Sequence, residues 1–266
     1  PHAAVTWGNS IHSPKEPGHL RIFYQNVNGL KPHDAFAEFK LSCKVLAECE
    51  IDVAGLVETM IDWLQRAPLN ECRTIIRSQW PRSKFITSTS TIPYPTYHKP
   101  GGTCTFIVDQ WSDQVAKYGS DPYGLGRRTY IQIVGQGGQT LVICTVYQAV
   151  KTTGDTTNYS QQHTLLRLQG ITDPDPRRRL ISDLTVQIKE WQEKQSEVII
   201  LADINEFLGA SSKGFISLVT ECGSVDVMAF QHKLTNEVPA YARGKTRLDY
   251  MLVTPALLKY TMNLIH

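Results

Sequence analysis

Residues 198–205 read Val198-Ile199-Ile200-Leu201-Ala202-Asp203-Ile204-Asn205, an apolar run that ends in an acid and an amide. A continuous run of branched aliphatic residues predicts a strand that is buried on both faces. A carboxylate at the end of such a strand loses hydration unless another group compensates its charge. The stretch therefore predicts a sheet with a polar site at one end.

Other strand-like runs along the chain end in polar side chains in the same way. We expect such strands at residues 21–27, 51–57, 103–108, 129–134, 140–147 and 248–253. The turn signal Asn28-Gly29 follows the first of them, and Glu58 closes the second. The glycine-rich residues 135–138 predict an antiparallel hairpin between the strands on either side.

Helical signals lie between the strands. Phe36, Phe39, Cys43 and Leu46 recur at helical spacing and predict an amphipathic helix. Leu165, Leu166 and Leu168 indicate a further helix. The acidic and proline residues at 173–176 favour the start of a longer helix.

The segment 81–100 is rich in proline, serine and threonine, and we expect it to be irregular and exposed. The whole pattern favours a single layered α/β domain at residues 20–266, after a flexible lead-in at residues 1–19.

Composition limits the possible functions only weakly. The chain has 27 Lys+Arg against 25 Asp+Glu, a balance that neither requires nor excludes nucleic acid. Any DNA-binding surface must therefore come from local clusters, and the candidates are Arg127-Arg128, Arg177-Arg178-Arg179 and the pair Arg243 and Lys245. The last pair is preferred because it adjoins the strand that carries Asp249. A solvated charged face remains the alternative for each cluster.

The six cysteines form no Cys-x-x-Cys pair, which disfavours a zinc site and indicates a reducing intracellular compartment. No apolar run is long enough to span a bilayer, so we expect no membrane association.

Each polar residue at a strand end has an ordinary structural explanation when it is taken alone. Asn28 belongs to a turn signal, Tyr147 is compatible with a core position, and Asp203 with Asn205 is compatible with a helix cap. Glu58 alone is compatible with a solvated turn. Their joint occurrence in chain order favours one common site, because carboxylate and amide oxygens suit Mg²⁺ and phosphate.

This order of motifs resembles the endonuclease/exonuclease/phosphatase superfamily, which includes deoxyribonuclease I and the apurinic/apyrimidinic endonucleases. The matching pieces are Gln25-Asn26-Val27-Asn28-Gly29-Leu30, Leu56-Val57-Glu58-Thr59, Gly101-Gly102-Thr103, Thr145-Val146-Tyr147, Leu201-Ala202-Asp203-Ile204-Asn205 and Arg247-Leu248-Asp249-Tyr250. The first, third and last of these look most like the endonuclease domains of non-long-terminal-repeat retrotransposons. The resemblance implies a deoxyribonuclease I-like fold, a four-layer sandwich of two mixed β-sheets flanked by helices.

The resemblance also implies a role for each matching residue. Glu58, aided by Asn28, would bind Mg²⁺ or Mn²⁺, and Asp203 would orient or deprotonate the attacking water. Asn26 and Asn205 would bond the scissile phosphate and nearby catalytic groups. Tyr147 would contact the phosphate or the developing charge, and Asp249 would orient a catalytic histidine.

Two departures from the superfamily pattern stand out. Many members have aspartate where this chain has Asn28, and a neutral amide binds Mg²⁺ more weakly than a carboxylate. A Ser-Asp-His motif that follows the Arg-Leu-Asp-Tyr strand in the superfamily does not occur before His266. We therefore expect the domain to be truncated at its C-terminus, and His266 to be a surface residue without a catalytic role.

The leading hypothesis is a metal-dependent endonuclease that nicks DNA, fused in the full-length protein to a reverse transcriptase and located in the nucleus. One alternative is a phosphatase or phosphodiesterase of the same fold. The other is a catalytically dead relic that lacks the terminal histidine.

Overall fold

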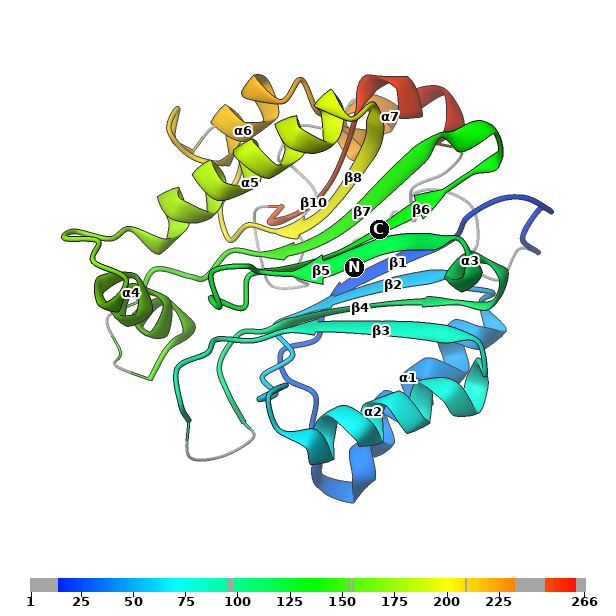
Figure 1. Ribbon diagram of the computed structural model, residues 1–266, viewed down its shortest axis with the longest axis horizontal. Helices are drawn as coiled ribbons and strands as arrows, with labels where there is room; N and C mark the ends of the chain where they lie inside the picture. Colours follow the sequence, from blue (N-terminus) through cyan, green and yellow to red (C-terminus); the bar gives the residue numbers. More distant parts are fainter. Residues whose placement is uncertain are drawn as a thin grey trace, which may run out of the picture.

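The computed structural model describes residues 14–94, 98–152, 154, 156–208, 210–232 and 247–261. Two β-sheets stack face to face, and helices cover the outer face of each sheet (Figure 1). Both sheets contain parallel and antiparallel pairs of strands. The predicted sandwich of two mixed sheets flanked by helices is therefore confirmed. Residues 1–13 of the expected lead-in lie outside the described part of the chain.

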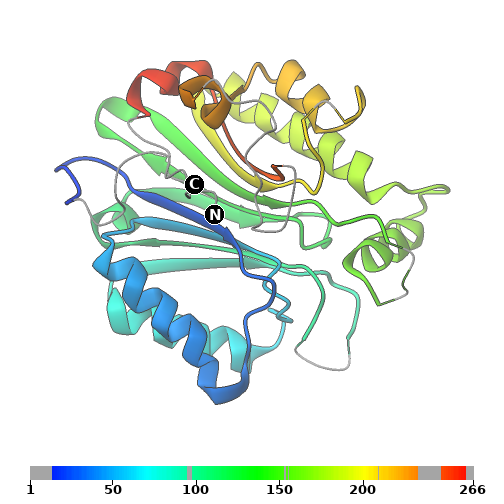
Figure 2. The same ribbon diagram turned by 180° about the vertical axis from the view of Figure 1, so that it is seen from behind.

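The first sheet is formed by the N-terminal part of the chain. Its strands, in spatial order, are β1 (Ile22–Asn26), β2 (Val53–Val57), β4 (Thr103–Val108) and β3 (Ser83–Ser88). The helices α1 (Ala37–Glu48) and α2 (Arg66–Gln79) pack on its outer face, as Figure 2 shows from behind. Cys43 and Cys72 are fully buried in the core between these helices and the sheet.

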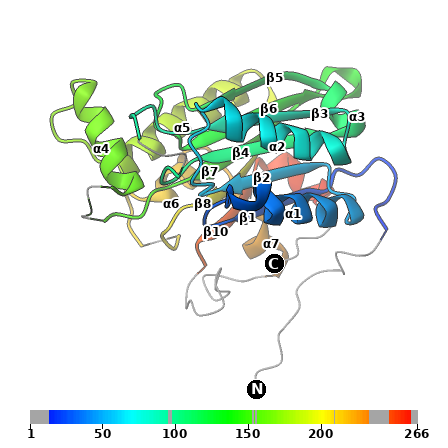
Figure 3. The same cartoon turned by 90° about the horizontal axis from the view of Figure 1, so that it is seen from below.

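The second sheet is formed by the rest of the chain. Its strands, in spatial order, are β5 (Val115–Ser120), β6 (Arg128–Val134), β7 (Thr140–Tyr147), β8 (Ser196–Asp203), β10 (Asp249–Val253) and β9 (Val225–Asp226). Its outer face is covered by α5 (Pro176–Glu193) and α6 (Phe215–Glu221). Shorter elements are α3 (Asp109–Asp113), α7 (Val227–His232) and 3-10 turns at His33–Phe36, Gln136–Gly138 and Pro255–Tyr260. Figure 3 shows α4 (Asn158–Leu168) beyond one end of the sandwich.

A third apolar core lies between the two sheets, and small residues let the sheets approach closely at its centre. A Cβ atom added at Gly55 would lie 2.5 Å from the Thr145 hydroxyl, so a larger residue would push β2 away from β7. The Thr105 hydroxyl bonds those of Thr129 and Thr145, each at 2.7 Å, and so links the sheets with no unpaired group. These contacts set the distance between β2 and β4 of the first sheet and β6 and β7 of the second.

The helix α5 illustrates how local sequence sets the element boundaries. The Asp175 side chain accepts hydrogen bonds from the backbone N–H groups of Arg177 and Arg178, and Pro176 occupies the first turn. Leu184 and Ile188 are fully buried on the face toward the sheet. The predicted helix start at residues 173–176 is thereby confirmed.

Two other expectations have clear outcomes. The hairpin predicted around residues 135–138 is confirmed, because β6 and β7 pair antiparallel. The prediction that residues 81–100 are irregular throughout is wrong, because β3 runs through Ser83–Ser88. The short β-prone run from Phe85 to Thr87 lies among proline, serine and threonine residues, so its strand signal is weak. The strand pairs with β4 on one side only.

All six cysteines are free and buried, as expected of small apolar core residues. Within the described ranges, no helix combines the length and the apolar character that crossing a bilayer requires.

Candidate active site

Three residues that lie far apart in the sequence meet at one end of the sandwich. Asn26 is the last residue of β1, Glu58 follows β2, and Asp203 is the last residue of β8. The Asn26 amide Nδ2 donates to Glu58 Oε2 at 2.8 Å and to Asp203 Oδ2 at 2.7 Å. One amide thus holds two carboxylates from different sheets side by side.

The backbone at this end of the sandwich is strained. Asn28, Glu58 and Asn205 have φ values of +45°, +54° and +47°, in the left-handed region that residues other than glycine rarely adopt. The Glu58 carbonyl accepts from the Gly29 N–H at 2.8 Å, which fixes the turn after β1 against the turn after β2. Such strain persists only where surrounding contacts enforce it, and it concentrates at functional sites.

Asp203 is a buried carboxyl poised to accept a proton near neutral pH. Burial raises its pKa to about 6, and the charge of Glu58 acts in the same direction. Hydrogen bonds from Asn26 and from the Asn205 N–H, the latter at 3.1 Å, oppose the shift. The residue is only 4% exposed, so little bulk water surrounds its carboxyl group.

Tyr147 lies beside Asp203, because the two residues are paired across β7 and β8. Burial raises the pKa of the Tyr147 phenol well above its usual value, and the charges of Glu58 and Asp203 raise it further. The hydroxyl therefore stays protonated and can act only as a hydrogen-bond donor toward these oxygens or a substrate oxygen.

Asp249 stands directly opposite Asp203 across β10 and β8. Burial raises its pKa to about 7, and the charge of Asp203 adds to the shift, while Arg247 opposes it. Its Oδ1 atom is buried without a hydrogen-bond partner. Asp249 is thus the third carboxyl group of the site, and it has an unused acceptor oxygen.

Asp249→Asn should stabilise the metal-free protein at about pH 8 and have little effect at about pH 4. The Asp249 pKa is raised from 3.8 to about 7, so the folded protein holds this carboxyl protonated where the unfolded chain ionises it. The parent therefore loses stability as the pH rises through this window, and the asparagine variant lacks that loss. Urea denaturation at both pH values measures the difference. A variant less stable than the parent at about pH 8 would contradict the raised pKa.

Two residues that the sequence did not assign to this site contribute to it. Tyr24 has a buried hydroxyl, and burial, followed by the charges of Asp203 and Asp249, raises its pKa, while a backbone hydrogen bond from Asp203 opposes the shift. It lies two residues before Asn26, so strand alternation places both on one face of β1, and that spacing could have revealed it.

Arg177 is the second, and it ties together the two loops beside Asp203. Its guanidinium donates to the carbonyls of Ala149 and Ile204 at 2.8 and 3.3 Å, and to Glu206 Oε2 at 2.6 Å. The Asn205 amide Nδ2 in turn donates to the Gln148 carbonyl at 2.8 Å. The sequence suggested Arg177 as a DNA contact, whereas its side chain is engaged in holding these loops.

Two other predicted DNA contacts are wrong. The side chains of Arg127 and Arg128 are 0% and 2% exposed, so neither can reach a phosphate backbone outside. Arg127 instead pairs with Asp121 at 2.6 Å and with Asp183 at 2.8 Å inside the protein. Arg243, Lys245 and His266 lie outside the residues that the structure describes.

The residues at the site fit a hard divalent cation. Their donor atoms are the carboxylate oxygens of Glu58 and the amide oxygen of Asn28, the type that Mg²⁺ and Mn²⁺ prefer. No group of three Asp, Glu, His or Cys side chains that could hold a metal occurs among the described residues. The protein would thus supply only part of the coordination shell, as is usual where Mg²⁺ also binds substrate phosphate.

Several solved structures share this fold at low sequence identity. The catalytic domain of Xenopus laevis APE2 superposes with a TM-score of 0.56 at 16% identity, over 90% of this chain and 83% of that one. An AP endonuclease from Archaeoglobus fulgidus gives 0.58 at 14% identity, over 91% and 89%. The mannosyl-6-phosphatase Bt3783 of Bacteroides thetaiotaomicron gives 0.51 at 12% identity, over 90% and 86%.

These likenesses establish a deoxyribonuclease I-like fold, the fold of endonuclease/exonuclease/phosphatase proteins. No protein-family model and no curated protein matches the sequence. The reaction must therefore be argued from the site itself.

Proposed function

We propose that this chain is a divalent-metal-dependent phosphodiester hydrolase that nicks DNA. The observation that carries the proposal is the Asn26 amide, which bonds Glu58 and Asp203 at 2.8 and 2.7 Å and so gathers an acidic site at the ends of both sheets. Hydrolysis of a phosphodiester requires a positioned water and stabilisation of the negative charge that develops on oxygen.

Asp203 is the group that orients the attacking water and takes its proton. A carboxylate with a pKa of about 6 is mostly ionised at neutral pH, yet is a stronger base than an ordinary aspartate. Asn26 uses both N–H bonds on the carboxylates, so we assign it to positioning Asp203 and not to the phosphate. Asn205 keeps one amide hydrogen after its bond to Gln148, and this hydrogen can meet a phosphate oxygen.

The protonated Tyr147 hydroxyl has one hydrogen, which bonds Glu58, and it would turn toward the phosphate or the developing charge once Glu58 binds the cation. The free Oδ1 of Asp249 can accept an N–H bond, which suits the orientation of a histidine. Glu58, aided by Asn28, would hold Mg²⁺ or Mn²⁺, and the bound cation would offset the charge that develops on the phosphate oxygens.

DNA is proposed as the substrate on two grounds. The sequence motifs resemble the endonuclease domains of non-long-terminal-repeat retrotransposons, and two of the structural neighbours are an AP endonuclease and the APE2 catalytic domain. The same resemblance supports a retroelement origin, fusion to a reverse transcriptase, and action in the nucleus. A phosphatase remains the second candidate, because a mannosyl-6-phosphatase has the same fold.

Nicking of supercoiled plasmid DNA, by a chain that includes the Ser-Asp-His strand expected after Asp249, tests the proposal. We expect conversion to the open circle in Mg²⁺ and none in EDTA. Glu58→Gln, prepared in parallel, should lose the activity and thus controls for a contaminating nuclease. Hydrolysis of p-nitrophenyl phosphate without nicking would favour the phosphatase. Hydrolysis of neither substrate would indicate a catalytically dead relic.

A further inference from the structure

A pocket of about 300 Å³ surrounds one end of the strand β3, away from the site described above. Its lining includes Arg73, Arg77, Lys84, Phe85, Ile86 and Tyr118, from α2, β3 and β5. Ser83, at the pocket end of β3, pairs with Val108 of β4. Ser88, at the other end of β3, pairs with Thr103, which in turn pairs with the last residue of β2, next to Glu58. The pocket and the candidate active site are therefore at opposite ends of the first sheet.

The pocket is strongly cationic. Arg73 and Arg77 are exposed on α2, and neither makes an ion pair or hydrogen bond within the described ranges. The Lys84 ammonium donates to the Val115 carbonyl at 3.3 Å and keeps its other two hydrogens. No acidic side chain lines the pocket, so its three cations are uncompensated there.

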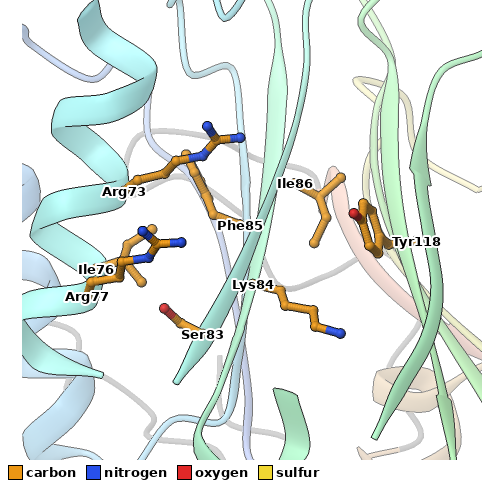
Figure 4. A pocket seen from close by; sticks show the side chains of 8 residues that line it. All are labelled: Arg73, Ile76, Arg77, Ser83, Lys84, Phe85, Ile86 and Tyr118. Atoms are coloured by element: carbon orange, nitrogen blue, oxygen red, sulfur yellow. The ribbon is translucent and has the colours of Figure 1, made fainter. Parts of the chain in front are cut away.

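The two sides of β3 contribute different parts of this pocket. Figure 4 shows Arg73 and Arg77 on the side of β3 that carries Phe85, between the strand and α2. Lys84 points to the other side, toward Tyr118 of β5. Tyr118 is 60% exposed. An extended ligand bound along β3 would therefore contact Arg73 and Arg77 on one side and Lys84 on the opposite side.

The free edge of β3 adds unused backbone hydrogen-bonding groups. β3 is the outermost strand of its sheet and pairs only with β4. The Asp109 N–H donates to the Arg82 carbonyl at 2.8 Å, so in this antiparallel pair residues 82, 84 and 86 bond toward β4. By alternation, the N–H and C=O groups of Ser83, Phe85 and Thr87 point outward, and no other part of the described chain bonds them.

We propose that this edge of β3 binds an extended acidic peptide segment of a partner protein by strand addition. The outward groups offer donors and acceptors in alternation, which a peptide backbone matches. A DNA backbone provides phosphate acceptors but no donors for the outward carbonyls, so the observations favour a peptide. Successive side chains of the added strand point to opposite faces, so acidic residues at neighbouring positions would reach Arg73 and Arg77 on one face and Lys84 on the other.

Fluorescence anisotropy with a short fluorescein-labelled peptide rich in glutamate and valine tests the proposal. We expect saturable binding to the intact chain. Arg77→Glu should weaken it roughly tenfold or more, since a charge-assisted bond is lost and a repulsive charge is gained. Arg66→Glu reverses an exposed charge on the same helix outside the pocket, so it is the matched control and should change affinity little.

A second comparison needs no change to the protein. The same peptide with N-methyl groups on alternate amides keeps its charge but cannot complete a β-ladder, and we expect it to bind much more weakly. Equal binding of the methylated peptide would refute strand addition. Equal or tighter binding of oligothymidine of the same charge would show a general polyanion site instead. No binding of the unmodified peptide would overturn the proposal. The cations would then serve to keep this edge strand from pairing with strands of other molecules.

Discussion

Asp203→Asn is expected to slow plasmid nicking roughly thousandfold, within the range of 10²–10⁴ that general base catalysis contributes. The substitution keeps the size of the side chain and one acceptor oxygen, but an amide cannot take a proton from water. Asn26 and the Asn205 N–H both donate to Asp203, so Asn26 loses one acceptor while the backbone bond can persist. Initial rates of open-circle formation in Mg²⁺ measure the effect.

The pH profile separates a catalytic role of Asp203 from a structural one. In the parent, the rate should rise with pH and level off by about pH 6, because only the ionised Asp203 accepts a proton and a cation bound at Glu58 lowers its pKa from the metal-free value of about 6. Asp109→Asn is a suitable control, since Asp109 is exposed, and asparagine tolerates its φ of +49°. Full activity of Asp203→Asn with an unchanged pH profile would remove Asp203 from the mechanism.

Arg127→Met is expected to lower the free energy of unfolding by about 4 kcal/mol, because breaking a buried ion pair leaves an uncompensated charge inside the protein. The side chains of Arg127 and Asp121 are both 0% exposed and are joined by two hydrogen bonds, at 2.6 and 3.0 Å. Asp183 would keep its bond to Arg179, whereas Asp121 would lose its ion-pair partner. Urea denaturation at neutral pH measures the loss.

Arg82→Met provides the matched comparison for this loss. Arg82 and Asp113 form an ion pair at 2.8 Å with side chains that are 62% and 58% exposed. Exposed pairs contribute about 0–1 kcal/mol, so this variant should unfold almost as the parent does. Similar losses in the two variants would contradict the view that burial makes the Arg127 network critical.

The stability contributed by Asp121 should also depend on pH. Burial alone would raise the Asp121 pKa, but the charge and hydrogen bonds of Arg127 outweigh it and hold the pKa below the usual 3.8. A depressed pKa stabilises the fold above the usual value, and that contribution is lost as the pH falls through the folded-state pKa. The difference between Arg127→Met and the parent should therefore shrink in strong acid.

The sequence predicted the elements that carry a clear period or a capping signal. The apolar run at Val198–Leu201 and the acidic start of α5 both have local causes, and both elements lie where the sequence indicated. It missed β3, because a short edge strand bonds one neighbour only and needs few apolar residues. It also missed α2, although Leu69, Cys72 and Ile76 recur at helical spacing on its buried face and give a clear local signal.

The charged residues show the limits of reading function from clusters. Arg127-Arg128 forms a basic pair in the sequence, and such a pair suggests a phosphate contact. Both residues lie on or next to the start of β6, a strand with helices or a second sheet over each face, so both side chains are buried. Their acidic partner Asp183 lies 56 residues away along the chain, and no local pattern reveals that distance.

The sequence by itself determined which strands end in amides and acids, since alternation and apolar runs are local properties of the chain. Only the tertiary structure decided that Asn26, Glu58 and Asp203 share one amide, because the residues are separated by up to 177 positions and belong to two sheets. The packing that joins them depends on Gly55 and the threonine contacts between β4, β6 and β7. The distance between the two sheets depends on the volumes of side chains from several strands, and no single segment of the sequence determines it.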